Sequence, residues 1–200
     1  MRLSLPSVVP VACLAVALVG CSPTAESPVA ESATPVETTV ESPSPEVPVM
    51  DSGLPHDALP DIPGGRGSWD ECPYLDTDWV SDTNGQRTLG VGVDPRFDTP
   101  ACVFWSYPDE PHLTVLVRTM PDTAAAINVV DWAAPVDSTE PAEEPAGWSG
   151  GRAGGGMVPD REGALYAVQK ENMAVVVFTN QDQSLKAELV ATEVIASLGL

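Results

Sequence analysis

The stretch Met173-Ala-Val-Val-Val-Phe178 is apolar at every position. A strand with one solvated face alternates apolar and polar residues, so a run without alternation predicts a strand covered on both faces. A second run of β-forming residues, Ala164–Lys170, precedes it across Glu171-Asn172, which predicts a hairpin. Leu185–Leu198 follows as an expected helix, with Ser184 as its N-cap and Gly199 after its end. We therefore expect a central hairpin between layers of helices.

A second hairpin is expected further upstream. Ala101–Tyr107 and Leu113–Thr119 are rich in β-forming residues, and the turn Pro108-Asp-Glu-Pro111 separates them. Asp122 is placed to cap a helix that runs to about Ala134. Its inner face is expected to carry Ala126, Ile127, Val130 and Ala133 or Ala134.

The beginning of the domain is expected to be helical. Cys72–Asp82 has proline at an early position, where the missing N–H costs nothing, and Asn84-Gly85 predicts a left-handed cap at its end. Leu75 and Trp79 are four residues apart and share the expected buried stripe. Leu89–Val93 is expected to be a glycine-interrupted strand. The order helix, strands, helix, strands, helix predicts an α+β domain over residues 69–200, with an antiparallel sheet flanked by helices.

Residues 1–20 have the pattern of a signal peptide. Arg2 is followed by an uncharged apolar core of about 12 residues, too short for the roughly 20 that span a bilayer. Leu18-Val-Gly-Cys21 resembles the bacterial lipobox, which implies acylation (palmitate) of Cys21 and an anchor in the cell membrane at its extracytoplasmic face. The alternative is an ordinary signal peptide with an incidental cysteine.

Residues 21–68 read as the acylated cysteine followed by a disordered tether of Pro, Ser, Thr, Val, Ala and Glu. No aromatic residue occurs before Trp69, so the segment buries too little apolar surface to offset the entropy of ordering. Its acidic side chains keep it solvated: Glu26, Glu31, Glu37, Glu41, Glu46, Asp51, Asp57 and Asp61.

Charge and cysteine usage narrow the class of protein. The net charge of −20 disfavours nucleic acid as a partner, because such partners need clustered Lys and Arg. Cys13 leaves with the signal peptide and Cys21 is acylated, which leaves Cys72 and Cys102. Outside the cytoplasmic membrane this pair predicts a disulfide, and two reduced thiols are the alternative.

The chain combines Cys72-Pro-Tyr-Leu, Cys102-x-x-Trp105, the mid-chain helix, and the apolar strand with its terminal helix. In these features it resembles actinobacterial secreted lipoproteins classed as a domain of unknown function. The resemblance covers residues 70–200. It implies a Mog1/PsbP-like α/β/α sandwich and supplies no catalytic residue.

Residues 135–159 are expected to form a long loop and a binding site. Loops beyond about 12–15 residues are often binding loops or lids. The candidate residues are Trp148, as an apolar anchor, with Arg152, Gly154, Gly155 and Gly156. The alternative is a mobile insertion with Trp148 packed on the core. A phosphate cradle is disfavoured, because no Lys-Ser/Thr follows the glycines.

Catalytic and metal-binding patterns are weak. His112 is interpreted as a surface histidine at a turn, and no Gly-x-Ser-x-Gly elbow occurs. Asp76, Asp78 and Asp82 resemble a calcium loop faintly, but Val80 breaks the alternation of oxygen ligands, and a solvated helix face is favoured. The sequence predicts no catalytic residue, no metal and no cofactor.

The sequence therefore favours a lipid-anchored envelope protein that is not an enzyme and binds a ligand or another protein. The expected partners are the membrane, through Cys21, and an envelope protein or an apolar or glycolipid ligand. An accessory subunit of an envelope assembly is one alternative, and a hydrolase of an envelope substrate is a disfavoured one.

Overall fold

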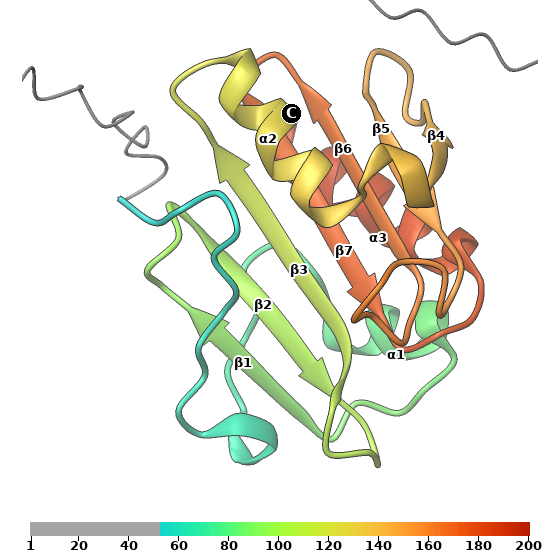
Figure 1. Cartoon of the computed structure of the whole chain (residues 1–200). Helices are drawn as coiled ribbons and strands as arrows, with labels where there is room; N and C mark the ends of the chain where they lie inside the picture. The colour runs from blue at the N-terminus through green and yellow to red at the C-terminus, as the bar shows by residue number, and fades with distance from the viewer. Residues whose placement is uncertain (1–52) are drawn as a thin grey trace, which may run out of the picture. The chain divides into compact units, whose positions relative to one another are not determined.

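The computed structural model describes residues 53–200 (Figure 1). The expected signal peptide, Cys21 and the expected tether up to residue 52 lie outside the described residues. The α-helices are α1 (Thr77–Asn84), α2 (Thr123–Ala133) and α3 (Ser184–Leu198), and two short 3-10 helices are η1 (Gly65–Gly67) and η2 (Val136–Ser138). The strands are β1 (Gly90–Asp94), β2 (Thr99–Trp105), β3 (Pro111–Thr119), β4 (Glu140–Ala142), β5 (Ser149–Ala153), β6 (Leu165–Lys170) and β7 (Met173–Thr179).

The run 173–178 lies in β7, at the centre of the sheet. The strand order is β1-β2-β3-β7-β6-β5-β4, and all named neighbours pair antiparallel. Val175 and Val177 pack in one apolar cluster, whereas Ala174 and Val176 pack in another. Because successive side chains of a strand point to opposite faces, both faces of β7 are buried. The predicted central, doubly covered strand is confirmed.

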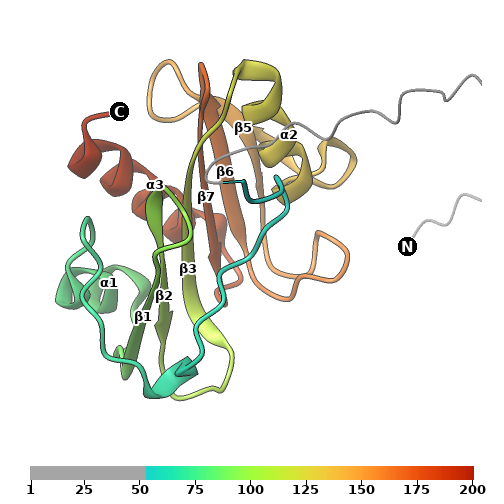
Figure 2. The same cartoon turned by 90° about the vertical axis from the view of Figure 1, so that its left-hand side faces the viewer.

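The helices form layers on both sides of the sheet. Figure 2 shows α1 and α3 on one face and α2 on the other. The cluster that contains Val175 includes Val190 and Val194 of α3, and the opposite cluster includes Val129 and Val130 of α2. The predicted α+β class, with an antiparallel sheet flanked by helices, is confirmed.

The helix ends follow the expected chemistry, with local corrections. Asp122 accepts a hydrogen bond from the Ala125 N–H at 2.8 Å, and Gly85 and Gly199 adopt left-handed conformations with φ of 69° and 68°. The first helix starts later than expected, at Thr77, because the Asp76 carboxylate caps it by accepting from the Trp79 N–H.

Two side-chain or cap assignments in the other helices were wrong. On α2, Ile127 is 40% exposed, and Val129 takes the inward position. For α3, Ser184 is the first helical residue, and the capping position belongs to Gln183, which makes no side-chain cap bond.

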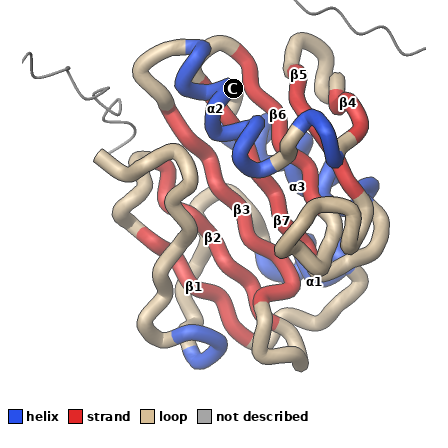
Figure 3. The backbone as a smooth tube through the Cα atoms, viewed as in Figure 1, coloured by secondary structure: helices blue, strands red, loops and turns tan. Residues whose placement is uncertain are grey.

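The ordered domain begins earlier than the expected boundary at residue 69. Leu54 and Ala58 pack against the α2-side cluster, and the Asp61 N–H donates to the Asp94 carboxylate at 2.8 Å. Figure 3 shows this segment as a loop along β1 and β2 that ends in the short η1 turn. Leu54 and Ala58 are half-buried against the sheet, and Leu59 is exposed, so residues 53–68 are attached to the domain by a few apolar contacts and hydrogen bonds.

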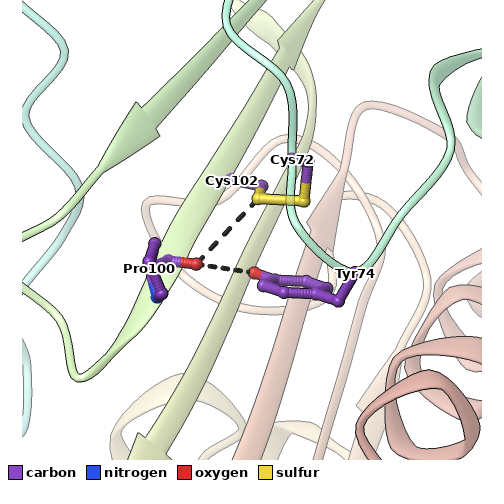
Figure 4. The surroundings of a disulfide bond; sticks show 4 residues. All are labelled: Cys72, Tyr74, Pro100 and Cys102. Atoms are coloured by element: carbon purple, nitrogen blue, oxygen red, sulfur yellow. Dashed lines mark hydrogen bonds between the residues drawn. A yellow bond between two sulfur atoms is a disulfide. The ribbon is translucent and has the colours of Figure 1, made fainter.

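The predicted disulfide is confirmed. Cys72 and Cys102 are bonded, with Cα atoms 5.8 Å apart, and both are buried (Figure 4). Beside the bond, the Tyr74 hydroxyl donates to the Pro100 carbonyl at 2.9 Å. The Cys102 sulfur lies 3.9 Å from the same oxygen, but a disulfide sulfur has no hydrogen to donate. The disulfide ties the segment before α1 to the second strand of the sheet.

Candidate functional site

Residues 135–159 form structured elements rather than the expected loop. They contain η2 and the strands β4 and β5, which extend the sheet beyond β6. Glycine permits this extension, because a Cβ at Gly150 would overlap the backbone carbonyl of Ala167 in β6. At Gly151 a Cβ would lie 2.9 Å from the Ala134 methyl group at the end of α2. The glycines therefore serve close packing of a strand, and not mobility.

Trp148 is part of the core. Its side chain is 4% exposed and packs in the α3-side cluster, in agreement with the alternative that placed it on the core. The preceding turn is fixed by β6, since the Tyr166 hydroxyl donates to the Glu144 carbonyl at 2.6 Å and accepts from the Glu144 N–H at 3.2 Å. Trp148 is therefore not available as an anchor for a ligand.

Arg152 and Gly154 do line a hollow. It has a volume of about 550 Å³ and is also lined by Ser138, Met157 and Ser184. Arg152 lies between two carboxylates, with nitrogen–oxygen distances of 3.7 Å to Glu140 and 3.4 Å to Glu188.

Gly155 and Gly156 follow in the turn after β5. Gly155 donates its N–H to the Asp182 carbonyl at 3.0 Å, and Gly156 has a φ of 71°. Of the five predicted site residues, the structure thus brings only Arg152 and Gly154 together in a hollow.

Two further hollows adjoin this one. One of about 140 Å³ lies beside the end of α2, and one of about 540 Å³ lies beside Trp132 and Arg161. All of Asp137–Glu140 lines the hollow of about 550 Å³, and parts of this stretch line the other two hollows. We call the three together the η2–β4 groove.

Each part of the η2–β4 groove carries one exposed large apolar side chain. Met157 is 65% exposed, Val136 is 77% exposed and Leu59 is 52% exposed. Hydroxyl groups of Ser138, Thr139 and Ser184, together with the charged groups of Arg152 and Glu140, lie among them. The groove is amphipathic, and its chemistry suits a ligand that has both an apolar part and a hydroxylated or polar part. The sequence signal was the presence of Val136 and Met157 in segments rich in Pro and Gly.

His112 is buried, and its interpretation as a surface residue was wrong. It is 0% exposed, because α1 and the following chain cover the start of β3. Asn84 Nδ2 lies 2.7 Å from His112 Nδ1, and Thr88 Oγ1 lies 3.3 Å from His112 Nε2. The Asn84 amide is oriented by two further bonds, since its Nδ2 donates to the His112 carbonyl and its Oδ1 accepts from Thr179 Oγ1.

This geometry defines the protonation of the ring. Because Nδ1 faces an amide donor, Nδ1 accepts and the proton resides on Nε2, which donates to Thr88. Burial lowers the pKa of His112 to about 4, so the ring is neutral at pH 7. An Nε2 that already carries a proton cannot remove one from the Thr88 hydroxyl, so the arrangement differs from a nucleophile–base pair.

The acidic residues near α1 do not form a calcium loop. Asp76 caps the helix, and Asn84 faces His112 in the interior. Across residues 53–200 no group of three or more His, Cys, Asp or Glu side chains is arranged to hold a metal ion.

Comparison with family models gives one match. The model of a domain of unknown function, DUF2020, matches residues 54–200. This chain belongs to the DUF2020 family. The match begins at Leu54, where the chain starts to pack against the sheet, so the DUF2020 domain includes residues 54–68, the last part of the segment that the sequence assigned to the tether. No curated protein matches the chain. Within the described part of the chain, no helix has both the length and the apolar character needed to cross a membrane.

Proposed function

We propose that this DUF2020 protein is a lipid-anchored protein of the extracytoplasmic membrane face, whose domain binds an amphipathic ligand such as a glycolipid. The lipobox-like Leu18-Val-Gly-Cys21 supports the anchor. The Cys72–Cys102 disulfide supports an oxidising compartment, because disulfides are rare in the cytosol. The antiparallel sheet with helices on both faces (Figure 2) agrees with the α/β/α sandwich that the resemblance to Mog1/PsbP-like folds implies. The same resemblance supports an actinobacterial source.

The η2–β4 groove carries the proposal for the ligand. Apolar surface rimmed by polar residues can mark a ligand-binding groove, and each hollow of the η2–β4 groove combines one exposed apolar side chain with polar ones. In this proposal Met157, Val136 and Leu59 contact the hydrocarbon part of the ligand. The hydroxyl groups of Ser138 and Thr139, together with the Arg152–Glu140 pair, bind the hydroxyl groups of its head.

The domain acts in this proposal without catalysis. The support is the orientation of His112. In the described chain its ring has two side-chain hydrogen-bond partners, the amide of Asn84 and the hydroxyl of Thr88, and the Nε2 proton points to that hydroxyl. A general base needs a free lone pair toward the group that it deprotonates.

Photolabelling of the full chain in phosphatidylcholine vesicles tests the ligand. The probe is a decyl maltoside that carries a photoreactive group on its alkyl chain. We expect labelled peptides from residues 136–157, and a loss of labelling of at least about 10-fold in Met157→Glu and Val136→Asp, because a charge in the groove disfavours hydrocarbon.

The matched control is Leu189→Glu, which places the same charge on a residue of α3 that is 48% exposed. It should keep wild-type labelling. Equal labelling of Met157→Glu, Val136→Asp and wild type would exclude the groove as the site.

An accessory subunit of an envelope assembly is a second candidate, and the outer side of α3 favours it. Leu185 and Leu189 are 57% and 48% exposed and lie one helical turn apart, the spacing at which two side chains present one apolar contact. Pull-down from membranes distinguishes the candidates, since Leu189→Glu should lose a protein partner but keep the glycolipid.

The anchor is tested separately by detergent-phase partitioning. The wild-type chain should enter the detergent phase, and Cys21→Ala should remain in the aqueous phase, because two acyl chains are needed for stable anchoring. Equal partitioning of both would refute acylation at Cys21.

A further inference from the structure

Trp69 is an exposed aromatic residue on a fixed backbone. Its side chain is 66% exposed, although its main chain forms a parallel bridge to Val91 at the edge of the sheet. The Asp70 N–H donates to the Val91 carbonyl at 2.8 Å, and the Val91 N–H donates to the Ser68 carbonyl at 3.0 Å. The chain therefore holds the indole in solvent at a defined place, which is unusual for the largest apolar side chain.

Two hollows meet at this residue. One has a volume of about 650 Å³ and is lined by residues 69–77 and Ser197, and the other has about 560 Å³ and is lined by parts of α1 and residues 85–88. Trp69 and Thr77 line both. We call the two together the Trp69 groove. Trp69 lies at the β1 edge of the sheet, whereas β4, which lines two of the three hollows of the η2–β4 groove, forms the opposite edge.

The lining of the Trp69 groove is strongly acidic. It contains five carboxylates and one basic group, Arg87, and the carboxylates are Asp70, Glu71, Asp76, Asp78 and Asp82. Among the described residues, the ion pairs of Arg66, Arg96 and Arg152 involve none of these five carboxylates. Fields of one sign are focused in clefts, so the groove attracts cations and repels anions.

We propose that the Trp69 groove binds a basic segment of another protein. The indole face takes a guanidinium or ammonium group by cation–π contact, and the carboxylates on either side pair with the flanking basic side chains. The occupant is a chain segment rather than a single small cation, because each hollow has the volume of a ligand site by itself and the aromatic residue stands between the two. This site is independent of the glycolipid groove.

Calorimetric titration of the full chain in detergent micelles with a tetra-arginine peptide tests the proposal. The acidic residues between 22 and 52 also attract the peptide, so the measured quantity is the difference between variants. We expect Trp69→Ala, and separately Asp70→Asn with Glu71→Gln, to weaken binding at least 10-fold. Unchanged melting temperatures will verify folding, since the indole of Trp69 is largely in solvent.

The chain contains a matched control patch. Tyr107 is 69% exposed and is followed by two exposed acids, Asp109 and Glu110, of which Asp109 already pairs with Arg66 at 3.3 Å. Tyr107→Ala, and Asp109→Asn with Glu110→Gln, should change the affinity less than 2-fold. Equal losses of affinity in both patches would show that the peptide responds only to net charge, and would overturn the proposal. Undetectable binding, or an unchanged affinity of Trp69→Ala, would also overturn it.

Discussion

The two halves of the sheet on either side of β7 are held by different means. The half with β1, β2 and β3 contains the Cys72–Cys102 bond and the buried hydrogen bonds around His112. The half with β6, β5 and β4 has neither, and its outer strands approach their neighbours through Gly150 and Gly151. Close approaches at glycine occur in both halves, since a Cβ at Gly90 of β1 would also overlap the Arg66 carbonyl. The first half differs because it adds a covalent bond and a buried histidine with its hydrogen bonds.

The difference teaches where each half is vulnerable. The first half should lose stability on reduction, because reduction breaks the disulfide. It should also lose stability in acid, because acid protonates the buried neutral His112. The described strands β4, β5 and β6 contain no disulfide and no histidine, so the second half is tested by added volume, because interiors are packed too densely to accept an extra carbon beside a backbone oxygen.

Removal of the disulfide should have the largest effect. We expect Cys72→Ala with Cys102→Ala to lower the free energy of unfolding by about 3–4 kcal/mol, because the bond closes a loop of about 30 residues in the unfolded chain. Urea unfolding of the full chain measures it, with reduced wild type as the control. A loss below about 1 kcal/mol in both would show that the first half does not depend on the bond.

Acid should destabilise the first half through His112. Its pKa is about 4 in the folded protein and about 6.5 when unfolded, so the unfolded state binds a proton more readily. Protonation of His112 leaves the free energy of unfolding unchanged well above pH 6.5. As the pH falls toward 4 it lowers that free energy, by about 2 kcal/mol at pH 5 and about 3 kcal/mol at pH 4. Urea unfolding between pH 7.5 and 5 should show this slope in wild type and a flatter one in His112→Gln; identical slopes would contradict the mechanism.

An added methyl group should destabilise the second half. We expect Gly150→Ala to cost about 1–3 kcal/mol and to increase amide exchange in β4 and β5, because the new carbon meets the rigid Ala167 carbonyl. Gly67→Ala is the control, since nothing lies within 4 Å of its Cβ, and it should change stability by less than about 0.5 kcal/mol. Similar values for both variants would remove the packing argument.

Arg152→Ala should have the smallest effect on stability. Its side chain is 41% exposed and its partners are at 3.4 and 3.7 Å, so the loss should be below about 1 kcal/mol and should vanish in 0.5 M salt. Melting curves at low and high salt measure it, with Arg152→Lys as the control that keeps the charge. A larger loss that persists in salt would indicate that packing of the Arg152 side chain, and not its ion pairs, stabilises this edge of the sheet.

The sequence was sufficient where a signal is local. The unbroken apolar run of β7, the cap at Asp122, the glycines at 85 and 199, and the two hairpins each depend on residues close together in the chain. The disulfide followed from the number of cysteines. These elements determined the α+β class correctly.

The failures involve contacts between distant residues. Gly150 and Gly151 give no strand signal, because the reason for glycine there is the approach of β6 and α2. The burial of His112 depends on Asn84, which is 28 residues away, and nothing near His112 indicates it. The candidate groove likewise depends on Met157, Val136 and Leu59, which three separate segments contribute.

Arg118 determines how the domain would carry a mechanical load. Its buried guanidinium donates to the carbonyls of Pro55 at 3.1 Å and Leu54 at 3.2 Å, and its backbone lies in β3, paired with Ala174 of β7. A pull on the chain ahead of residue 54 therefore reaches the two middle strands first, and only then the edge strand β1. Force applied at that point is shared by the longest ladder of the sheet, which resists shear better than an edge strand resists peeling.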